Sequence, residues 1–188
     1  MVTMFSEKQV IEGCIKGDRL SQEALYNRFA GKMLAVSKRY LKDMALAEDA
    51  FQDAFVKVFL HLKNFTFQSS LETWMTRIFI NESINKLRSM KRLALQVNID
   101  EQNRQFPENF EQAPDKFDSE LVLMLLEKLP ENYKIVLMLY AIDGYSHKEI
   151  SEKLNMPEST SRSSLTRARS MLWLLYNKEI KKHESRRI

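Results

Sequence analysis

The chain between residues 146 and 169 combines residue types that recognise duplex DNA. Arg162 and Arg167 lie within a stretch rich in serine and threonine. Hydroxyl groups and the free amides at a helix N-terminus bind phosphate oxygens, and an arginine can read guanine through two hydrogen bonds in the major groove. We therefore expect Ser159, Thr160, Ser161, Arg162, Ser163, Thr166 and Arg167 to contact DNA, with Ser164 pointing outward beside them.

A second group of residues, between 65 and 92, suits single-stranded DNA. Phe65, Phe67 and Trp74 are followed closely by polar and then by basic residues. Aromatic faces stack on unpaired bases, and cations follow the phosphate backbone. The alternative is that Phe65 and Trp74 are core residues, as we expect of Ile78 and Phe79. The polar and basic members of the group are Gln68, Ser69, Ser70, Thr73, Arg77, Lys86, Arg88 and Arg92.

Residue patterns that would support catalysis or metal binding are missing from the sequence. Glu48, Asp49 and Asp53 lie close together, but none of the 3 histidines has a metal-ligand spacing to them or to one another. The sequence also lacks a glycine-rich phosphate loop and a nucleophile elbow. We therefore expect no metal, no cofactor, no small-molecule substrate and no enzymatic activity. The acidic residues are expected to form a solvated face or a docking face for a basic partner.

Composition predicts an all-α protein. The 188 residues include only 4 glycines and 4 prolines, and the formal net charge is +4. Helix-favouring residues dominate at this composition. Cys14 is the single cysteine, which excludes an intrachain disulfide. We find no signal peptide and no apolar run near the roughly 18 residues of a membrane span, so a cytoplasmic location is expected.

Hydrophobic periodicity divides the chain into two small helical domains joined by an acidic linker. Periodicity is lost over 96–116, which contains Pro107 and Pro114, and this composition is typical of a flexible linker. The predicted domains are therefore 1–95 and 117–188. The predicted helices are 6–17, 21–41, 46–62, 71 to about 88–91, one from near 117 to Leu129, 131–142, 146–154 and 159–176, with capping boxes at Ser6, Ser69 and Ser146.

The last two predicted helices follow the helix-turn-helix plan. A short helix, a turn at Asn155 and a longer helix come in that order. Ile150 and Leu154 would form the inner face of the first helix, and Leu165 and Ala168 that of the second. The first turn of such a second helix is where base edges are usually contacted. The alternative from spacing alone is an ordinary helical hairpin with a solvated basic face.

Several blocks of the sequence resemble regions 2 and 4 of bacterial RNA polymerase sigma factors. Residues 47–59, with Ala47-Glu48-Asp49-Ala50-Phe51-Gln52-Asp53, and residues 65–92 resemble region 2. Residues 129–133, 145–154 and 163–169 resemble region 4. No third domain separates the two regions, and this arrangement is similar to that of the extracytoplasmic-function (ECF) type.

The resemblance implies a role for each predicted site. Core polymerase would bind region 2 through the clamp helices of its largest subunit, and region 4 through the beta flap. Promoter DNA would be the second partner, and an anti-sigma factor the third. Docking would use Asp49, Gln52, Asp53 and Lys57. Residues Phe67, Gln68, Ser69 and Ser70 would hold a flipped base, Thr73, Trp74, Arg77, Asn81, Arg88 and Arg92 would face the −10 element, and the helix from Ser159 would read the −35 element.

Two other functions compete with this interpretation. A transcription regulator could use the same helix-turn-helix and contact duplex DNA only, with its N-terminal half as a sensing or dimerisation module. The aromatic loop and the acidic linker argue against it. A protein-interaction module without any DNA role would tolerate the loss of Arg162 and Arg167, whereas a sigma factor would lose −35 binding.

Overall fold

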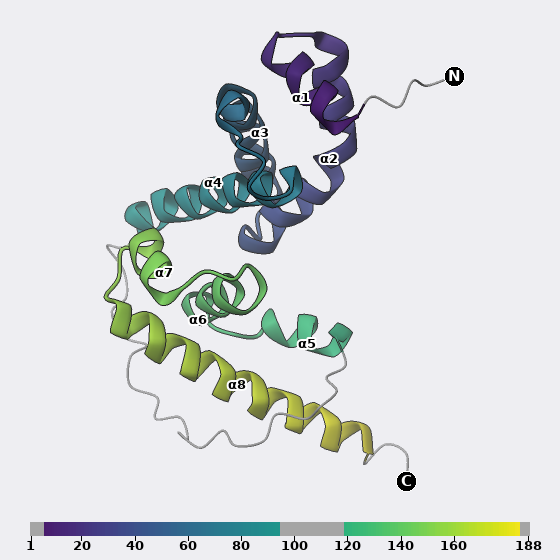
Figure 1. The fold of residues 1–188 in the computed structure, drawn as a ribbon. Coiled ribbons are helices and arrows are strands. Elements are labelled where there is room, and N and C mark those ends of the chain that lie inside the picture. The colour runs from purple at the N-terminus through teal and green to yellow at the C-terminus, as the bar shows by residue number, and fades with distance from the viewer. Residues whose placement is uncertain (1–5, 95–118, 185–188) are drawn as a thin grey trace. The chain divides into compact units, whose positions relative to one another are not determined.

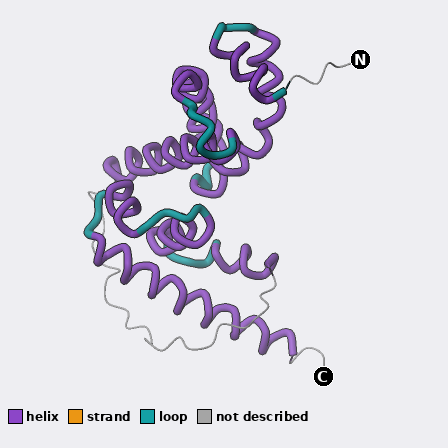
Figure 2. The backbone as a smooth tube through the Cα atoms, in the orientation of Figure 1, coloured by secondary structure: helices purple, strands orange, loops and turns teal. Residues whose placement is uncertain are grey.

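A computed structural model of the chain describes residues 6–94 and 119–184. Contacts between residues divide the chain into two units, 1–97 and 98–188. The predicted linker, 96–116, lies outside the described residues. Within the described ranges every regular element is a helix, and loops join the helices (Figure 2). The predicted all-α fold is therefore confirmed.

The described part of the first unit, residues 6–94, forms four α-helices and a short 3₁₀ turn, and the helices are labelled in Figure 1. Two of these helices begin two residues earlier than predicted because an aspartate caps each of them. The Asp18 carboxylate accepts a hydrogen bond from the Ser21 amide at 2.8 Å, and that of Asp43 accepts from the Leu46 amide at 3.0 Å. The elements are α1 (Glu7–Ile15), α2 (Arg19–Tyr40), α3 (Met44–His61), η1 (Leu62–Asn64) and α4 (Leu71–Ala94).

Helices α2, α3 and α4 pack against one another around an aromatic cluster. The ring centroids of Phe55 and Phe79 are 5.1 Å apart, and those of Phe51 and Phe79 are 5.8 Å apart. Ala47 and Ala54 on α3 are fully buried, and such small side chains let helices approach closely. The side chain of Phe79 is also fully buried, so it fixes α4 against α3 and thereby sets which face of α4 remains outside.

The second unit contains α5 to α8 and one π-helical turn, η2. The predicted helix 131–142 is α-helical only as far as Leu137, because the Asp143 amide donates to the Met138 carbonyl at 3.1 Å, five residues back. Gly144 follows with a φ of 72°. The elements are α5 (Ser119–Leu126), α6 (Glu131–Leu137), η2 (Met138–Ile142), α7 (His147–Leu154) and α8 (Glu158–Glu184).

Helix α8 extends eight residues beyond its predicted end at Tyr176. Its later turns pack on α5, where Leu121 and Leu125 are buried together with Tyr176. Ile180 packs against the same cluster. This burial stabilises turns whose own sequence, rich in lysine, carries only a weak apolar pattern.

Candidate nucleic-acid interface

In the loop before α4, the exposed ring of Phe67 packs on the buried ring of Phe65. Phe65 is buried, while 55% of the surface of Phe67 is exposed. The two ring centroids are 4.7 Å apart, and those of Phe65 and Trp74 are 5.4 Å apart. Phe67 has a φ of 58°, a left-handed conformation that costs energy for a bulky residue. The core alternative therefore holds for Phe65, whereas the Phe67 ring is available to a ligand.

The polar residues of this loop cap α4 and leave their outer surfaces to solvent. Gln68, Ser69, Ser70 and Thr73 are all exposed. The predicted capping box at Ser69 is wrong, because it is the Ser70 hydroxyl that accepts a hydrogen bond from the Thr73 amide, at 3.1 Å. The Ser70 and Thr73 hydroxyls also bond each other at 2.8 Å. This cap fixes the start of α4 at Leu71, four residues after Phe67.

The predicted −10 residues of α4 share one face by helical spacing. Thr73, Arg77, Asn81 and Arg88 follow one another at intervals of four, four and seven residues. Thr73 and Arg77 are exposed, and Asn81 and Arg88 are half-buried. Trp74 is half-buried, and its ring packs against Phe65. Its ring therefore belongs partly to the core. The side chain of Arg92, also predicted at this site, lies outside the described residues.

The predicted docking residues lie on α3, and two of them bond to α4. Asp49, Gln52 and Asp53 are exposed. Asp49 pairs with Lys86 at 3.1 Å, and Lys57 pairs with Glu82 at 2.7 Å. The docking face of α3 is thus connected by ion pairs to the helix that carries the predicted −10 residues.

Two exposed apolar residues lie on the same side of α3 as the predicted docking residues. They were not among the docking candidates predicted from the sequence. Val56 is 58% exposed and Leu60 is 62% exposed. Their spacing from Gln52 is four and eight residues, which places the three on one helical face. The sequence could have shown that both residues are exposed, because neither shares the helical spacing of the buried residues Ala47, Ala54 and Val58.

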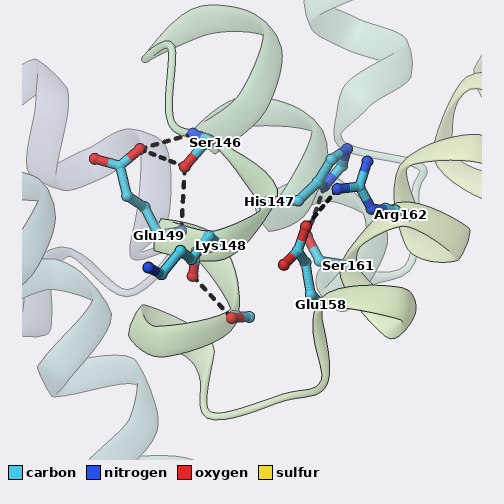
Figure 3. Close-up of polar contacts among 8 residues, drawn as sticks. Ser146, His147, Lys148, Glu149, Glu158, Ser161 and Arg162 are labelled. Carbon is cyan, nitrogen blue, oxygen red and sulfur yellow. Dashed lines mark hydrogen bonds and ion pairs between the residues drawn. The ribbon is translucent and has the colours of Figure 1, made fainter.

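The second unit contains the predicted helix-turn-helix. The Ser146 hydroxyl accepts from the Glu149 amide at 3.3 Å and the Glu149 carboxylate accepts from the Ser146 amide at 2.8 Å, so the predicted capping box is confirmed (Figure 3). Asn155 ends α7 in the left-handed conformation with a φ of 52°, which Asn tolerates. Ile150, Leu165 and Ala168 are buried as predicted.

The first turns of α8 expose hydroxyls and arginines. Ser159, Thr160, Arg162, Ser163 and Thr166 are exposed, and Arg167 is half-buried. The hydroxyls of Ser163 and Thr166 donate to carbonyls of their own helix at 3.1 and 3.2 Å. The Arg162 guanidinium pairs with the Glu158 carboxylate one turn earlier. The hydroxyls of Ser163 and Thr166 and the guanidinium of Arg162 therefore each have a partner within α8.

Two residues predicted to point outward are buried. Ser161 has no exposed surface, and Ser164 retains only 7%. Their positions explain this, because Ser161 precedes the inward-facing Leu165 by four residues and Ser164 precedes Ala168 by four. The prediction followed their polar character instead of the helical spacing. Ser161 therefore cannot make the DNA contact predicted for it without leaving its buried site.

The buried Ser161 hydroxyl bonds to His147 at the start of α7. The distance from Ser161 Oγ to His147 Nδ1 is 3.0 Å. Burial is the largest cause that lowers the pKa of His147 below its ordinary value, and the charges of Arg162 and Arg169 lower it further against the opposing charge of Glu158. The fold therefore favours the neutral imidazole over the charged form.

Family models and curated relatives match both units. The model for Sigma-70 region 2 matches residues 25–93, and the model for Sigma-70, region 4 matches residues 119–172. The RNA polymerase sigma-H factor of Pseudomonas aeruginosa is 27% identical over 182 residues, covering 92% of this chain and 94% of the relative. The ECF RNA polymerase sigma-E factor of Escherichia coli K12 is 27% identical over 185 residues, covering 92% and 95%.

The chain belongs to the extracytoplasmic-function family of RNA polymerase sigma factors. Two solved structures are also similar to it. RpoE of Bartonella quintana, solved with the anti-sigma factor NepR, has a TM-score of 0.48 and 19% identity over 81% of this chain and 94% of that one. CnrH, solved with the cytosolic domain of CnrY, has a TM-score of 0.48 and 20% identity over 90% and 96%.

Within residues 6–94 and 119–184, no helix is both long enough and apolar enough to cross a membrane. Over the same part of the chain, His, Cys, Asp and Glu side chains do not gather in groups of three that could bind a metal ion.

Proposed function

We propose that this sigma factor binds core RNA polymerase through the exposed face of α3 and then opens promoters with two chemically different DNA contacts. The α3 face offers Asp49, Gln52 and Asp53 beside the apolar Val56 and Leu60. Carboxylates flanking exposed apolar side chains suit a partner helix that carries basic and apolar residues. The clamp helices of the largest polymerase subunit are the proposed partner, and region 4 would meet the beta flap.

The observation that carries the proposal is the exposed ring of Phe67. An aromatic side chain that is 55% exposed, in a left-handed backbone conformation, costs free energy in the unbound protein. An unpaired base would cover that ring by stacking on it, and Gln68, Ser69 and Ser70 supply hydrogen-bonding groups around it. Residues Thr73, Arg77, Asn81 and Arg88 of α4 would continue the contact along the −10 strand, with Trp74 beside them and Arg92 at the far end.

The proposed −35 contact uses the exposed residues at the start of α8. Hydroxyls and the helix N-terminus would bind phosphates, and Arg162 or Arg167 would read a base in the major groove. The proposed residues are Ser159, Thr160, Arg162, Ser163, Thr166 and Arg167. These contacts need no bond-making chemistry, so we propose that the factor is not an enzyme and that it works in the cytoplasm, where the polymerase is.

Run-off transcription tests the proposal. Core polymerase with and without this protein would be supplied with a genomic library, and the start sites would be sequenced. We expect initiation at a defined set of promoters only when both are present. Binding to duplex DNA without any association with core polymerase would instead identify a helix-turn-helix regulator.

The docking face can be tested separately. Gln52→Ala and Leu60→Ala change exposed residues, so both variants should fold. We expect Leu60→Ala to weaken binding to core polymerase by about 1 kcal/mol or more, since an exposed leucine that becomes buried contributes about that much. Leu20→Ala, at a leucine that is 70% exposed on α2, is the matched control.

We also propose that an anti-sigma factor regulates this protein by covering the same α3 face. The exposed Val56 and Leu60 would be buried in either complex, so the two partners would exclude each other. Competition between core polymerase and a protein captured with the factor from its own host would test this. Simultaneous binding of both partners would contradict it.

A further inference from the structure

The fully buried Ser161 stands among the residues that face the DNA groove in the proposed function. Thr160 and Arg162, its neighbours in the chain, are exposed, while Ser161 itself has no exposed surface. Buried hydroxyls are nearly always hydrogen-bonded, and this one bonds His147 Nδ1 at 3.0 Å. A residue of α7 therefore holds the first turn of α8 by a side-chain bond, in addition to the apolar contacts deeper in the motif.

His147 is itself held by an element outside the helix-turn-helix. Its ring stacks on that of Tyr140, with the centroids 4.6 Å apart and the planes at 22°. Tyr140 is the middle residue of η2, and the Arg169 guanidinium lies 5.7 Å from its ring centroid. The imidazole thus contacts η2 and the first turn of α8 from its own position at the start of α7.

Figure 3 shows the surroundings of Arg162, the arginine that is proposed to read DNA. His147, Ser161, Glu158 and Arg162 gather where α8 begins. Arg162 directly follows Ser161 and pairs with Glu158 one turn earlier on the same helix. A rotation or shift of this turn would move the Arg162 guanidinium relative to any base. Base readout by arginine requires correct placement of two hydrogen bonds, so it is sensitive to such a shift.

We propose that His147 is a positioning residue for −35 recognition, which it serves by holding the Ser161 hydroxyl and thereby fixing the direction of the recognition helix α8. It contacts no base in this proposal and acts through Ser161. The inference rests on the proposed function, since it concerns how accurately the −35 contact is made. It predicts loss of discrimination between DNA sequences, with little loss of general affinity for DNA.

The test compares the holoenzyme on two DNA probes. One probe is a promoter duplex selected from a genomic library by the wild-type holoenzyme, and the other is the same duplex with its −35 element scrambled. The measured quantity is the ratio of the two affinities. The variants are His147→Phe, which can keep the stacking on Tyr140 without the hydrogen bond, His147→Asn, whose amide can replace Nδ1, Ser161→Ala, and the double variant His147→Phe/Ser161→Ala.

We expect His147→Phe and Ser161→Ala each to lower the ratio by roughly fivefold or more, the cost of a misplaced arginine contact. The double variant should lower it no further, because both changes remove the same bond. His147→Asn should keep the ratio within about twofold of the wild type. Ser151→Ala is the matched control, since the Ser151 hydroxyl donates to the Lys148 carbonyl of its own helix.

Three results would overturn the inference. The first is an unchanged ratio in both His147→Phe and Ser161→Ala. The second is a parallel fall in affinity for both probes together with a lower unfolding temperature, which would make the bond merely structural. The third is a His147→Asn variant as defective as His147→Phe. A wild-type protein that neither binds core polymerase nor selects a promoter would instead sink the proposed function, and this inference with it.

Discussion

The two surfaces that we propose to contact DNA are built on opposite physical principles. At the start of α4, the exposed Phe67 ring rests on Phe65 and offers an apolar face. At the start of α8, the Arg162 side chain and the neighbouring hydroxyls already have partners within the protein. The first surface gains free energy by being covered, whereas the second exchanges one set of polar contacts for another. Melted DNA suits the first, and a duplex groove suits the second.

The difference predicts a larger effect of mutation at the first surface. Phe67→Ala should weaken binding to a promoter fork with an unpaired −10 strand by about 2 kcal/mol, within the range for one base stacked on an aromatic ring. The fold should be unaffected because the ring is more than half exposed. Fluorescence of a 2-aminopurine in the −10 strand, measured with the variant holoenzyme, would report the loss.

The control for Phe67→Ala is Tyr26→Ala, which removes another exposed ring from the same unit. Tyr26 is 42% exposed, and its ring packs on Phe51 and Phe55 of α3. It should leave fork binding within error of the wild type. Equal losses in the two variants would mean that Phe67 acts through the stability of the unit and not by stacking.

A smaller effect is expected at the second surface. Arg162→Ala should cost about 1 kcal/mol in binding to the −35 duplex, the low end for an arginine–base contact, because binding must first break the pair with Glu158. The promoter fork without a −35 element should be bound as well as before. Competition assays with both probes would measure this, and Lys178→Ala, an exposed cation later on α8, is the control. A uniform loss on all probes would assign Arg162 to phosphate binding.

The sequence predicted the elements well because their apolar spacing and caps are local properties. Ser146 with Glu149, and the buried stripe through Ile150, Leu165 and Ala168, were all predicted and all observed. The ends of elements were predicted less well where tertiary packing decides them. Helix α8 continues past Tyr176 because α5 covers its later turns, and the π turn at η2 leaves no mark in the apolar pattern.

The candidate sites were predicted by residue type, and the errors arose there. Ser161 and Ser164 are polar but occupy inward positions, so chemistry and spacing disagreed and spacing was right. Val56 and Leu60 were the reverse case, apolar residues at outward positions of α3. The contact of His147 with Ser161 spans 14 residues and depends on the angle between α7 and α8, which sequence spacing does not give.

A still smaller effect, of opposite sign, should follow from Glu158→Gln. The glutamate pairs with Arg162, and in the proposed complex it would place a negative charge beside the phosphates of the duplex. Removing the charge should strengthen −35 binding by roughly 0.5 kcal/mol, while the helix loses a similar amount of stability at its N-terminus. Titration at several salt concentrations would show the gain shrinking as salt rises. Weaker binding in Glu158→Gln would show that the glutamate positions Arg162 for DNA instead of restraining it.

The smallest expected effect is a pH dependence of stability. We expect it in the second unit, which contains His147. The pKa of His147 is lowered in the folded protein by burial first and then by Arg162 and Arg169, with Glu158 opposing them. In a pH window just below the ordinary histidine value, the unfolded chain therefore binds more protons at this position than the folded chain does. Stability consequently rises with pH through this window. The contribution is fully present above the pKa of the unfolded chain and is lost as the pH falls toward the folded value.

Denaturant unfolding of the full chain between about pH 5 and pH 8 would measure this contribution. Trp173 reports on the second unit, and Trp74→Phe removes the other of the 2 tryptophans. We expect the second unit to lose stability on acidification, and to lose less of it in His147→Asn, which does not titrate. In the first unit, burial and the charge of Asp18 raise the pKa of Cys14 to about 11, well outside this range. If His147→Asn follows the wild type at every pH, His147 titrates alike in the folded and the unfolded chain, and burial does not lower its pKa.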